Sequence, residues 1–389
     1  MHRIKAGLFA GLLLLAAGEA CVYAAPTLKI GFNGAMTGLL ENIGKTAKKG
    51  AELAREDIDK KGGVTIGGTT YQVKFLYGDN TSDHTRATEV SLSLIGQEHV
   101  IGLIGPQASN NAVPAGGIAD AYQTPMISPW STAPATTKNR PYVFRVGALN
   151  DVQASLLAGF IAKQLKKTKL AILYDVISAY PRDMAKAVRK SFEVLQGAGS
   201  VVAFEEFRTG DTDFRPQLER ILQAGAEVIV TPQTDTQVAE IVRQARELGF
   251  NNLIMGSDSW AGGDLMKACG DDCKGLMFTG NYASGGAKGA NKVFVDRYLA
   301  AYGEQPNEVA ALTYDAVHSM VQALENISTL TGNIVEDRRL LKDQLVALKD
   351  FQGVTGTLSY NASGDPDKCV MVIEIDSNGI FTTKEMACP

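Results

Sequence analysis

Short apolar segments alternate with longer amphipathic segments along most of this chain, and that alternation limits the fold more than any other feature. The short segments, such as 27–34 (TLKIGFNG) and 169–175 (KLAILYD), are apolar on both faces and rich in strand-forming residues. The segments between them carry apolar residues at helical spacing. Strands that alternate with helices of this length form parallel sheets covered by helices. We predict strands at 27–34, 71–79, 100–106, 169–175, 200–206 and 226–231, and helices at 44–61, 85–97, 182–196, 213–224, 236–249, 291–301 and 308–327.

The alternation occurs twice, once on each side of about residue 147. A chain of 389 residues is longer than one hydrophobic core usually supports, and a single doubly wound domain would not need both series. The predicted fold class is therefore α/β, with two doubly wound parallel-sheet lobes between which the chain crosses more than once. A hairpin is predicted near the C-terminus, around the DSNG sequence at 376–379.

The N-terminus predicts export from the cytoplasm. Arg3 and Lys5 precede an apolar run from 6 to 17 that is too short to span a bilayer. Val22 and Ala24 then stand at the −3 and −1 positions of a cleavage site. Residues 1–24 are therefore predicted to be a secretory signal peptide.

The alternative interpretation of this N-terminus is a lipoprotein signal with a lipid anchor at Cys21. Gly18 disfavours it, because a lipoprotein signal prefers leucine or a similar residue three positions before the cysteine.

The net charge of −4 gives no electrostatic reason to expect nucleic acid as a partner.

Four cysteines remain after cleavage, and an even number in an oxidising compartment favours disulfides. The expected pairs are Cys269–Cys273 and Cys369–Cys388. A zinc site is the alternative, but no histidine lies at ligand spacing from either pair. We expect no metal and no cofactor.

The motifs of common enzyme classes are absent or incorrectly spaced. Gly38 and the Gly44-Lys45-Thr46 sequence resemble a phosphate-binding loop, but five residues separate the glycines where the motif has four. The chain has no G-x-S-x-G, H-E-x-x-H or G-x-G-x-x-G sequence, and its histidines are isolated. An exported α/β protein without a catalytic constellation is predicted to be a binding protein.

Two loops of the first series carry polar groups suited to a carboxylate ligand. Ser109 and Asn110 precede a helix, where free backbone N–H groups attract an anion. Trp130, Ser131 and Thr132 follow a short strand, where the hydroxyls could bind a carboxylate or an ammonium and the indole could wall a side-chain pocket. Ordinary helix capping and proline turns are the alternative roles for these residues.

The second series adds candidates for an ammonium group. Tyr180 lies between a strand and a helix, and Asp258 follows another strand. A carboxylate in a closed cleft would form a strong charge-assisted hydrogen bond to an amine. The alternative is that Asp258 only caps a helix. All four loops follow predicted strands, at the sheet edge where α/β proteins bind ligands.

The order of several segments resembles the leucine/isoleucine/valine-binding proteins, which are type I periplasmic binding proteins of ABC transporters. The resemblance extends from about residue 26 to the C-terminus. The segments that carry it are IGFNGAMTG (30–38), VIGLIGPQAS (100–109), MISPWSTAP (126–134), ILYDVISAYPRD (172–183), VRQARELG (242–249) and ALTYDAV (311–317).

The resemblance implies an organisation and a partner. Residues 25–146 with 279–365 would form an N-terminal lobe, and 147–278 with 366–389 a C-terminal lobe. Three crossovers would join the lobes, which close on the ligand like a hinge. The protein would be a periplasmic monomer that delivers its ligand to an ABC transporter permease in the inner membrane.

The resemblance also implies roles for individual residues. Ser109, Ser131 and Thr132 match positions that hold the ligand carboxylate. Asp258 and Tyr180 match positions that hold the ammonium, although Asp258 replaces the usual glutamate.

Three further positions depart from the leucine-binding pattern. They lie in the part of the site that is expected to select the side chain of the ligand. Ile43 aligns with an aromatic residue, Trp130 with a small one, and Gln233 lies in a segment that is usually rich in glycine and tyrosine. A branched-chain or other aliphatic amino acid is the leading ligand. Alternatives are an aromatic carboxylate or a short amide. A sensory ligand-binding module is an alternative function, and a hydrolase would require a serine–histidine pair in the cleft.

Overall fold

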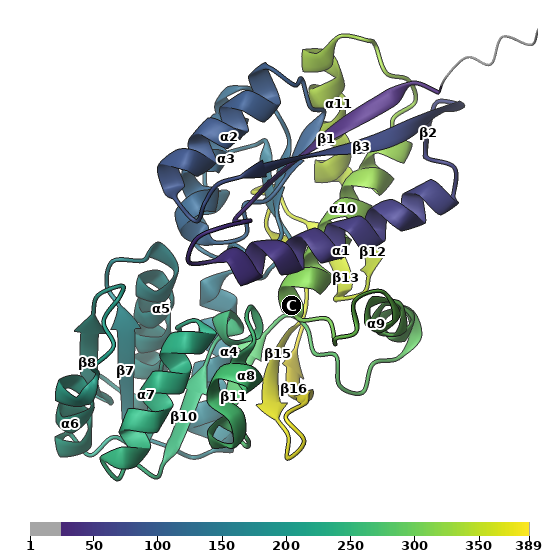
Figure 1. Ribbon diagram of the computed structural model, residues 1–389. Coiled ribbons are helices and arrows are strands. Elements are labelled where there is room, and N and C mark those ends of the chain that lie inside the picture. Colours follow the sequence, from purple (N-terminus) through teal and green to yellow (C-terminus); the bar gives the residue numbers. More distant parts are fainter. Residues whose placement is uncertain (1–24, 389) are drawn as a thin grey trace, which may run out of the picture.

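Two separate mixed sheets organise the protein in the computed structural model, which describes residues 25–388 (Figure 1). The predicted signal peptide and Cys21 lie outside the described residues. We call the sheet built from β1 to β6, with its helices, the first lobe. The sheet built from β7 to β11 with β15 and β16, with its helices, is the second lobe.

The sheet of the first lobe has the strand order β2-β3-β1-β4-β5-β6 and is parallel except where β2 pairs with β3. Its strands are β1 (Thr27–Gly34), β2 (Val64–Ile66), β3 (Thr69–Asp79), β4 (Gly102–Ile104), β5 (Met126–Ser128) and β6 (Val143–Arg145). Its helices are α1 (Glu41–Lys60), α2 (His84–Gly96), α3 (Ser109–Ala121), the 3₁₀ turn η1 (Pro134–Thr136), α9 (Gly289–Tyr302), α10 (Glu308–Glu325) and α11 (Ile334–Ala347).

Helices cover both faces of this sheet because successive strand residues point to opposite sides. In β4, Ile104 packs into the core formed with α1 and α10, while Leu103 packs with α2 and α3. Helices α1 and α10 approach closely at Gly50, where a Cβ atom would lie 2.2 Å from the Ala310 carbonyl oxygen. Only glycine permits this contact, which joins a helix early in the chain to one late in the chain.

The sheet of the second lobe has the order β16-β15-β11-β10-β9-β7-β8, with β7 to β11 parallel and β15 and β16 antiparallel. Its strands are β7 (Leu170–Asp175), β8 (Val201–Phe207), β9 (Val228–Val230), β10 (Leu253–Gly256), β11 (Met277–Gly280), β15 (Val370–Ile375) and β16 (Phe381–Ala387). Its helices are α4 (Asn150–Gly159), the π-helical η2 (Phe160–Gln164), α5 (Ala179–Gln196), α6 (Arg215–Gln223), α7 (Asp235–Glu247), the 3₁₀ turn η3 (Asp258–Ala261), α8 (Leu265–Cys269) and the 3₁₀ turn η4 (Gly270–Cys273).

The chain passes between the lobes three times, after β6, after β11 and after the short strand β14. Buried polar contacts tie two of these crossovers together. The Asn281 side-chain oxygen accepts a hydrogen bond from the Ala148 backbone N–H at 2.8 Å, and the Glu308 carboxylate accepts two from Asn281, also at 2.8 Å. A small sheet of β12 (Phe351–Gly353), β13 (Gly356–Tyr360) and β14 (Pro366–Asp367) precedes the third crossover.

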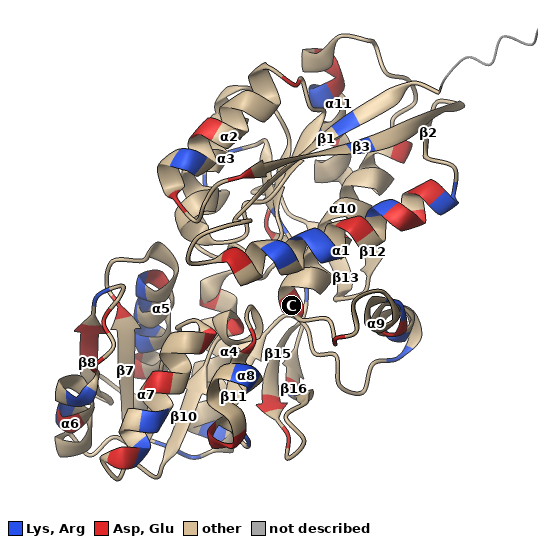
Figure 2. Cartoon of the chain, in the orientation of Figure 1, with Lys and Arg blue, Asp and Glu red and all other residues tan. Residues whose placement is uncertain are grey.

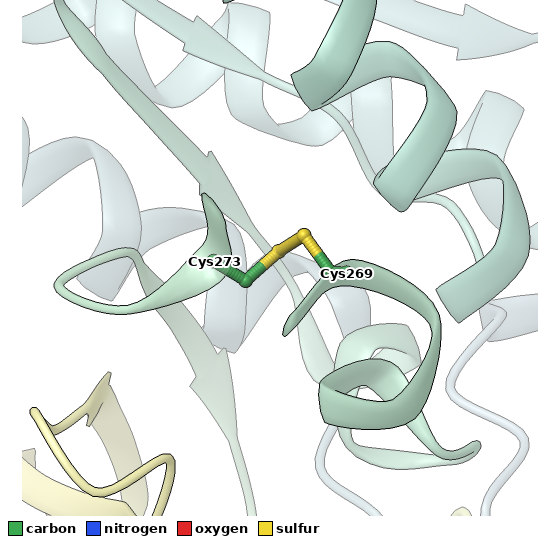
Figure 3. The surroundings of a disulfide bond; sticks show 2 residues. All are labelled: Cys269 and Cys273. Carbon is green, nitrogen blue, oxygen red and sulfur yellow. A yellow bond between two sulfur atoms is a disulfide. The ribbon is translucent and has the colours of Figure 1, made fainter. Parts of the chain in front are cut away.

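Both predicted disulfides are present. Cys269 and Cys273 close the turn between α8 and η4 (Figure 3). Cys369 and Cys388 join the start of β15 to the chain just after β16. Both bonds belong to the second lobe, and Cys269 and Cys273 are part of its hydrophobic core.

The predicted elements agree with the observed ones apart from their ends and a few additions. The antiparallel strands β2, β15 and β16 make each sheet mixed, and the 376–379 hairpin is the β15–β16 turn. The sequence analysis did not predict helices α4, α8 and α11, strands β2, β6 and β11, or the β12–β14 sheet. Most of these strands have only two to four residues, which is too few for a clear periodicity.

Charged residues lie mainly on the outer faces of helices, as Figure 2 shows for α1 and α7. Among residues 25–388, no helix is both long enough and apolar enough to cross a membrane.

Candidate ligand-binding cleft

A cavity of about 570 Å³ lies between the two lobes, and both lobes contribute to its walls. Its walls consist mainly of loops that follow the carboxyl ends of parallel strands, the usual location of ligands in open α/β sheets. The lining residues of the first lobe are Leu39, Leu40, Ser82, Gln107, Ala108, Ser109, Asn110, Asn111 and Trp130, and those of the second are Asp175, Ile177, Ser178, Tyr180, Pro181, Thr209, Gly210, Asp211, Thr212, Phe214, Pro232, Gln233, Thr234, Thr236, Gln237, Glu240, Asp258 and Ser259.

A buried acid forms the strongest electrostatic feature of the second-lobe wall. Asp258 begins η3 directly after β10 and is 1% exposed. Tyr180, in the first turn of α5, donates its hydroxyl hydrogen bond to Asp258, and its oxygen lies 2.6 Å from Ser257 Oγ. Burial raises the pKa of the Asp258 carboxyl to about 6, against the opposing effect of the Tyr180 hydrogen bond. Burial therefore disfavours the ionised form of Asp258, and a cation bound beside it would favour that form.

A second buried carboxyl lies close enough to Asp258 for the two charges to influence each other. Glu308, the first residue of α10, is 1% exposed. Burial, followed by the charge of Asp258, raises the pKa of Glu308 to about 8. Of the residues that line the described cavity, none is lysine, arginine or histidine. Glu308 itself does not line the cavity, and the buried Lys368 opposes the rise in its pKa, so Asp258 is the acid that an entering ammonium would meet.

The first-lobe wall contains a linked set of hydroxyls. Ser109 Oγ lies 2.8 Å from Ser131 Oγ, which in turn lies 2.7 Å from Thr136 Oγ1. Ser109 is also the first residue of α3, whose N-cap residue provides no side-chain hydrogen bond to the helix. The backbone N–H groups of this first turn and the Ser109 hydroxyl together form an environment that favours an anion.

A fully buried arginine holds the hydroxyl loop in place. Arg145 donates to the carbonyl oxygens of Ser131 and Ala133 at 3.0 and 2.9 Å, and its Nε lies 2.7 Å from Asp365 Oδ1. Burial lowers the pKa of Arg145 to about 10, and Asp365 opposes this effect. Arg145 does not line the cavity, so its role is to position the loop that follows β5.

Most of the predicted binding residues come together in the cavity wall. Ser109, Asn110, Trp130, Tyr180, Gln233 and Asp258 all line it. Three predicted residues do not. Ser131 lies behind Ser109, Thr132 donates to Asn150 Oδ1 at 2.6 Å beside the first crossover, and Ile43 packs towards Gly262 of the other lobe.

Several lining residues were missed by the sequence analysis. Gln107 and Asn111 lie in the same loop as Ser109, so their position after β4 was a usable signal. The buried Glu308, which does not line the cavity, had no such signal, because it is fifty positions away from Asp258 in a segment that predicts only a helix.

Besides the Thr132–Asn150 bond beside the first crossover, two other side-chain hydrogen bonds connect the lobes near the cleft. Asn110 Oδ1 of the first lobe accepts from the Ala179 backbone N–H of α5 at 2.8 Å. Asn307 Nδ2 of the first lobe donates to the Gly262 carbonyl oxygen at 3.1 Å. Trp130 also packs on Gly262, since a Cβ atom there would lie 2.3 Å from Trp130 Cη2. The lobes are therefore in direct contact on either side of the cavity.

Comparisons with known proteins agree with this architecture. A family model described as periplasmic binding protein matches residues 27–380. A leucine-, isoleucine-, valine-, threonine- and alanine-binding protein of Pseudomonas aeruginosa is 27% identical over 345 residues, which cover 88% of each chain.

Solved structures show the same similarity. The branched-chain amino acid transporter substrate-binding protein of Streptococcus pneumoniae, in complex with isoleucine, is 30% identical with a TM-score of 0.83, over 93% of this chain and 100% of that one. An ABC transporter solute-binding protein of R. palustris, in complex with benzoate, shares the fold with a TM-score of 0.81 at 22% identity, over 93% of this chain and 97% of that one. With a family match over nearly the whole described chain and a cleft between two α/β lobes, this protein belongs to the periplasmic binding protein family, as a non-enzymatic solute-binding protein of the ABC transporter type.

Proposed function

We propose that the protein captures an α-amino acid in the cleft between its lobes and delivers it to the permease of an ABC transporter. The observation that carries this proposal is the buried Asp258, which lines the cavity in a wall where no described lining residue is lysine, arginine or histidine. The relatives named above bind amino acids by their names, and the branched-chain amino acids are therefore the reference ligands for its tests.

The ammonium of the ligand would bind Asp258. An uncompensated buried carboxylate costs several kcal/mol, and an ammonium removes that cost by forming a charge-assisted hydrogen bond. Tyr180 would orient the carboxylate through the hydrogen bond it already donates.

The carboxylate of the ligand would bind the opposite wall. Ser109 lines the cavity and begins α3, so the ligand would meet the positive end of a helix dipole beside the Ser109 side chain. Ser131 would support this contact from behind Ser109 rather than touch the ligand. The ligand ammonium would thus bind the second lobe and its carboxylate the first lobe. Because one ligand contacts both lobes, its binding favours the closed arrangement of the lobes.

The lobes would move as two bodies, 25–146 with 279–365 and 147–278 with 366–389. Closure around the ligand would bring together surfaces of both lobes that the permease recognises. Export through the predicted signal peptide would place the protein in the periplasm. An amine-free carboxylate, as in the aromatic alternative, would leave the Asp258 carboxyl without a partner.

The test is a calorimetric titration of refolded, ligand-free protein with amino acids and matched amine-free acids. Asp258→Asn keeps the shape of the side chain and removes its charge. The exposed Asp213, which does not line the cavity, provides Asp213→Asn as the control. We expect Asp258→Asn to weaken amino-acid binding by about 3 kcal/mol, roughly a hundredfold, and the control to match the unmodified protein. Binding of amine-free acids alone would refute the proposal.

A further inference from the structure

Two buried side chains hold the backbone of Ala148, which lies in the first crossover between β6 and α4. The Ala148 N–H donates a hydrogen bond to Asn281 Oδ1 at 2.8 Å, and the Ala148 carbonyl oxygen accepts one from Gln153 Nε2 at 3.1 Å. Asn281 and Gln153 are fully buried, and neither lines the cavity. Both hydrogen-bonding groups of this crossover residue are therefore bound by side chains.

The two side chains are anchored in different lobes. Asn281, in the second crossover, donates through its backbone N–H and its Nδ2 to the carboxylate of Glu308, which begins α10 of the first lobe. Gln153 belongs to α4 of the second lobe, and its Oε1 accepts a hydrogen bond at 3.2 Å from Thr279 Oγ1 in β11. The N–H of Ala148 is thus tied to the first lobe and its carbonyl to the second.

This division matters because a rotation of two lobes is absorbed by dihedral-angle changes at a few crossover residues. The N–H and C=O groups of Ala148 lie on opposite sides of its Cα atom, so a change in φ or ψ turns one group relative to the other. Since their partners move with different lobes, such a turn weakens at least one of the two bonds. The bonds therefore favour the arrangement observed here, in which the lobes also meet through Asn110 and Asn307.

We propose that Asn281 and Gln153 form a hinge clamp on Ala148 that favours the arrangement in which the lobes meet, and that this clamp raises the affinity for every ligand that closure encloses. The inference rests on the proposed function, because it takes the capture of an amino acid to require closure. It assigns to that function two positioning residues outside the cavity wall. Because the clamp acts on the lobes and not on the ligand, its contribution is the same for each amino acid.

The first test removes one side of the clamp. Gln153→Met keeps the length of the side chain and removes the amide that holds the Ala148 carbonyl. Titration calorimetry of the refolded protein should show about a fivefold loss of affinity, equal for valine, leucine and threonine. Gln72→Met is the matched control, because Gln72 Nε2 donates to the Gly62 carbonyl oxygen at 2.9 Å within the first lobe and outside the crossovers. This control should bind like the unmodified protein.

A double variant tests whether the two residues act as one clamp. Asn281→Ala frees the N–H of Ala148 and should also lower the affinity about fivefold. A clamp holds only while both sides are attached, so the double variant should lose about as much affinity as either single variant. Independent effects would multiply to roughly 25-fold. Gln153 also lowers the pKa of Asp258, and an effect through that carboxyl would be independent of Asn281.

The outcomes separate the clamp from the proposed function, and circular dichroism melts show that each variant is folded. Original affinity in both folded single variants would overturn the clamp, while amino-acid binding still supports the function. A roughly 25-fold loss in the double variant, or unequal losses among the ligands, would also overturn it. Failure of every amino acid to bind the unmodified protein would refute the proposed function and, with it, a clamp on amino-acid capture.

Discussion

Replacing Asn110 by alanine should weaken the binding of every ligand by the same factor. Asn110 lines the cavity, but its side-chain oxygen already accepts a hydrogen bond from the Ala179 backbone N–H in the other lobe. Ala179 is the first residue of α5, and the N-cap residue Ser178 makes no side-chain hydrogen bond to that helix. Asn110 therefore caps a helix across the cleft, and it can do so only when the lobes are together.

The size of the effect follows from this one contact. A hydrogen bond of this kind contributes about 1 kcal/mol, which is also the typical contribution of a helix N-cap. The bond is absent from the open state, where water hydrates the Ala179 N–H. Asn110→Ala should therefore reduce the closed-to-open ratio about fivefold, and the apparent affinity should fall by the same factor.

Titration calorimetry with several amino acids measures the factor for each ligand, and stopped-flow release measures the dissociation rate. We expect about a fivefold loss of affinity throughout, mainly from faster release. Asn110→Asp keeps an acceptor at the helix N-terminus, so it should retain close to the original affinity.

Unequal losses among ligands would refute this reasoning, because they would mean that Asn110 contacts the ligand directly, as the sequence analysis expects. Equal affinity in Asn110→Ala and the unmodified protein would also refute it, since the cross-lobe bond would then have no influence on closure.

Further predictions concern pH, closure and stability. Amino-acid affinity should be highest well above pH 6 and should fall as the pH drops through 6. Burial raises the pKa of Asp258 to about 6, and only the carboxylate form pairs with an ammonium. Affinities measured by titration calorimetry that stay constant between pH 7.5 and 5 would contradict this role. Gly262→Ala should weaken the binding of all ligands without lowering the melting temperature of the ligand-free protein. The added Cβ would lie 2.3 Å from Trp130 Cη2 only when the lobes meet. Thermal melts of the ligand-free variant and calorimetric titrations with amino acids measure the two effects. Replacing Cys369 and Cys388 by alanine should lower the free energy of unfolding in urea by about 3 kcal/mol, given their sequence separation of 19, with ligand affinity retained; loss of affinity would show that the bond also supports the cleft.

The amino-acid sequence by itself predicts the framework of this protein. Apolar alternation identified the longer strands and most of the long helices of both sheets, including β1 over 27–34, because strand and helix periodicities are local properties. The cysteine pairs could also be predicted, since each pair is close in sequence or flanks a hairpin. Asp258 and Tyr180 could be proposed as neighbours because both follow strands that end at one sheet edge.

Only the tertiary structure decided which side chains face the cavity and which serve the fold. Ser131 and Thr132 look equivalent to Ser109 in the sequence, yet they point behind the wall because Arg145 and Asn150 hold their loop. Glu308 reaches Asp258 only through the return of the chain into the first lobe. Loop side chains take their direction from contacts with residues far along the chain, and no local periodicity records those contacts.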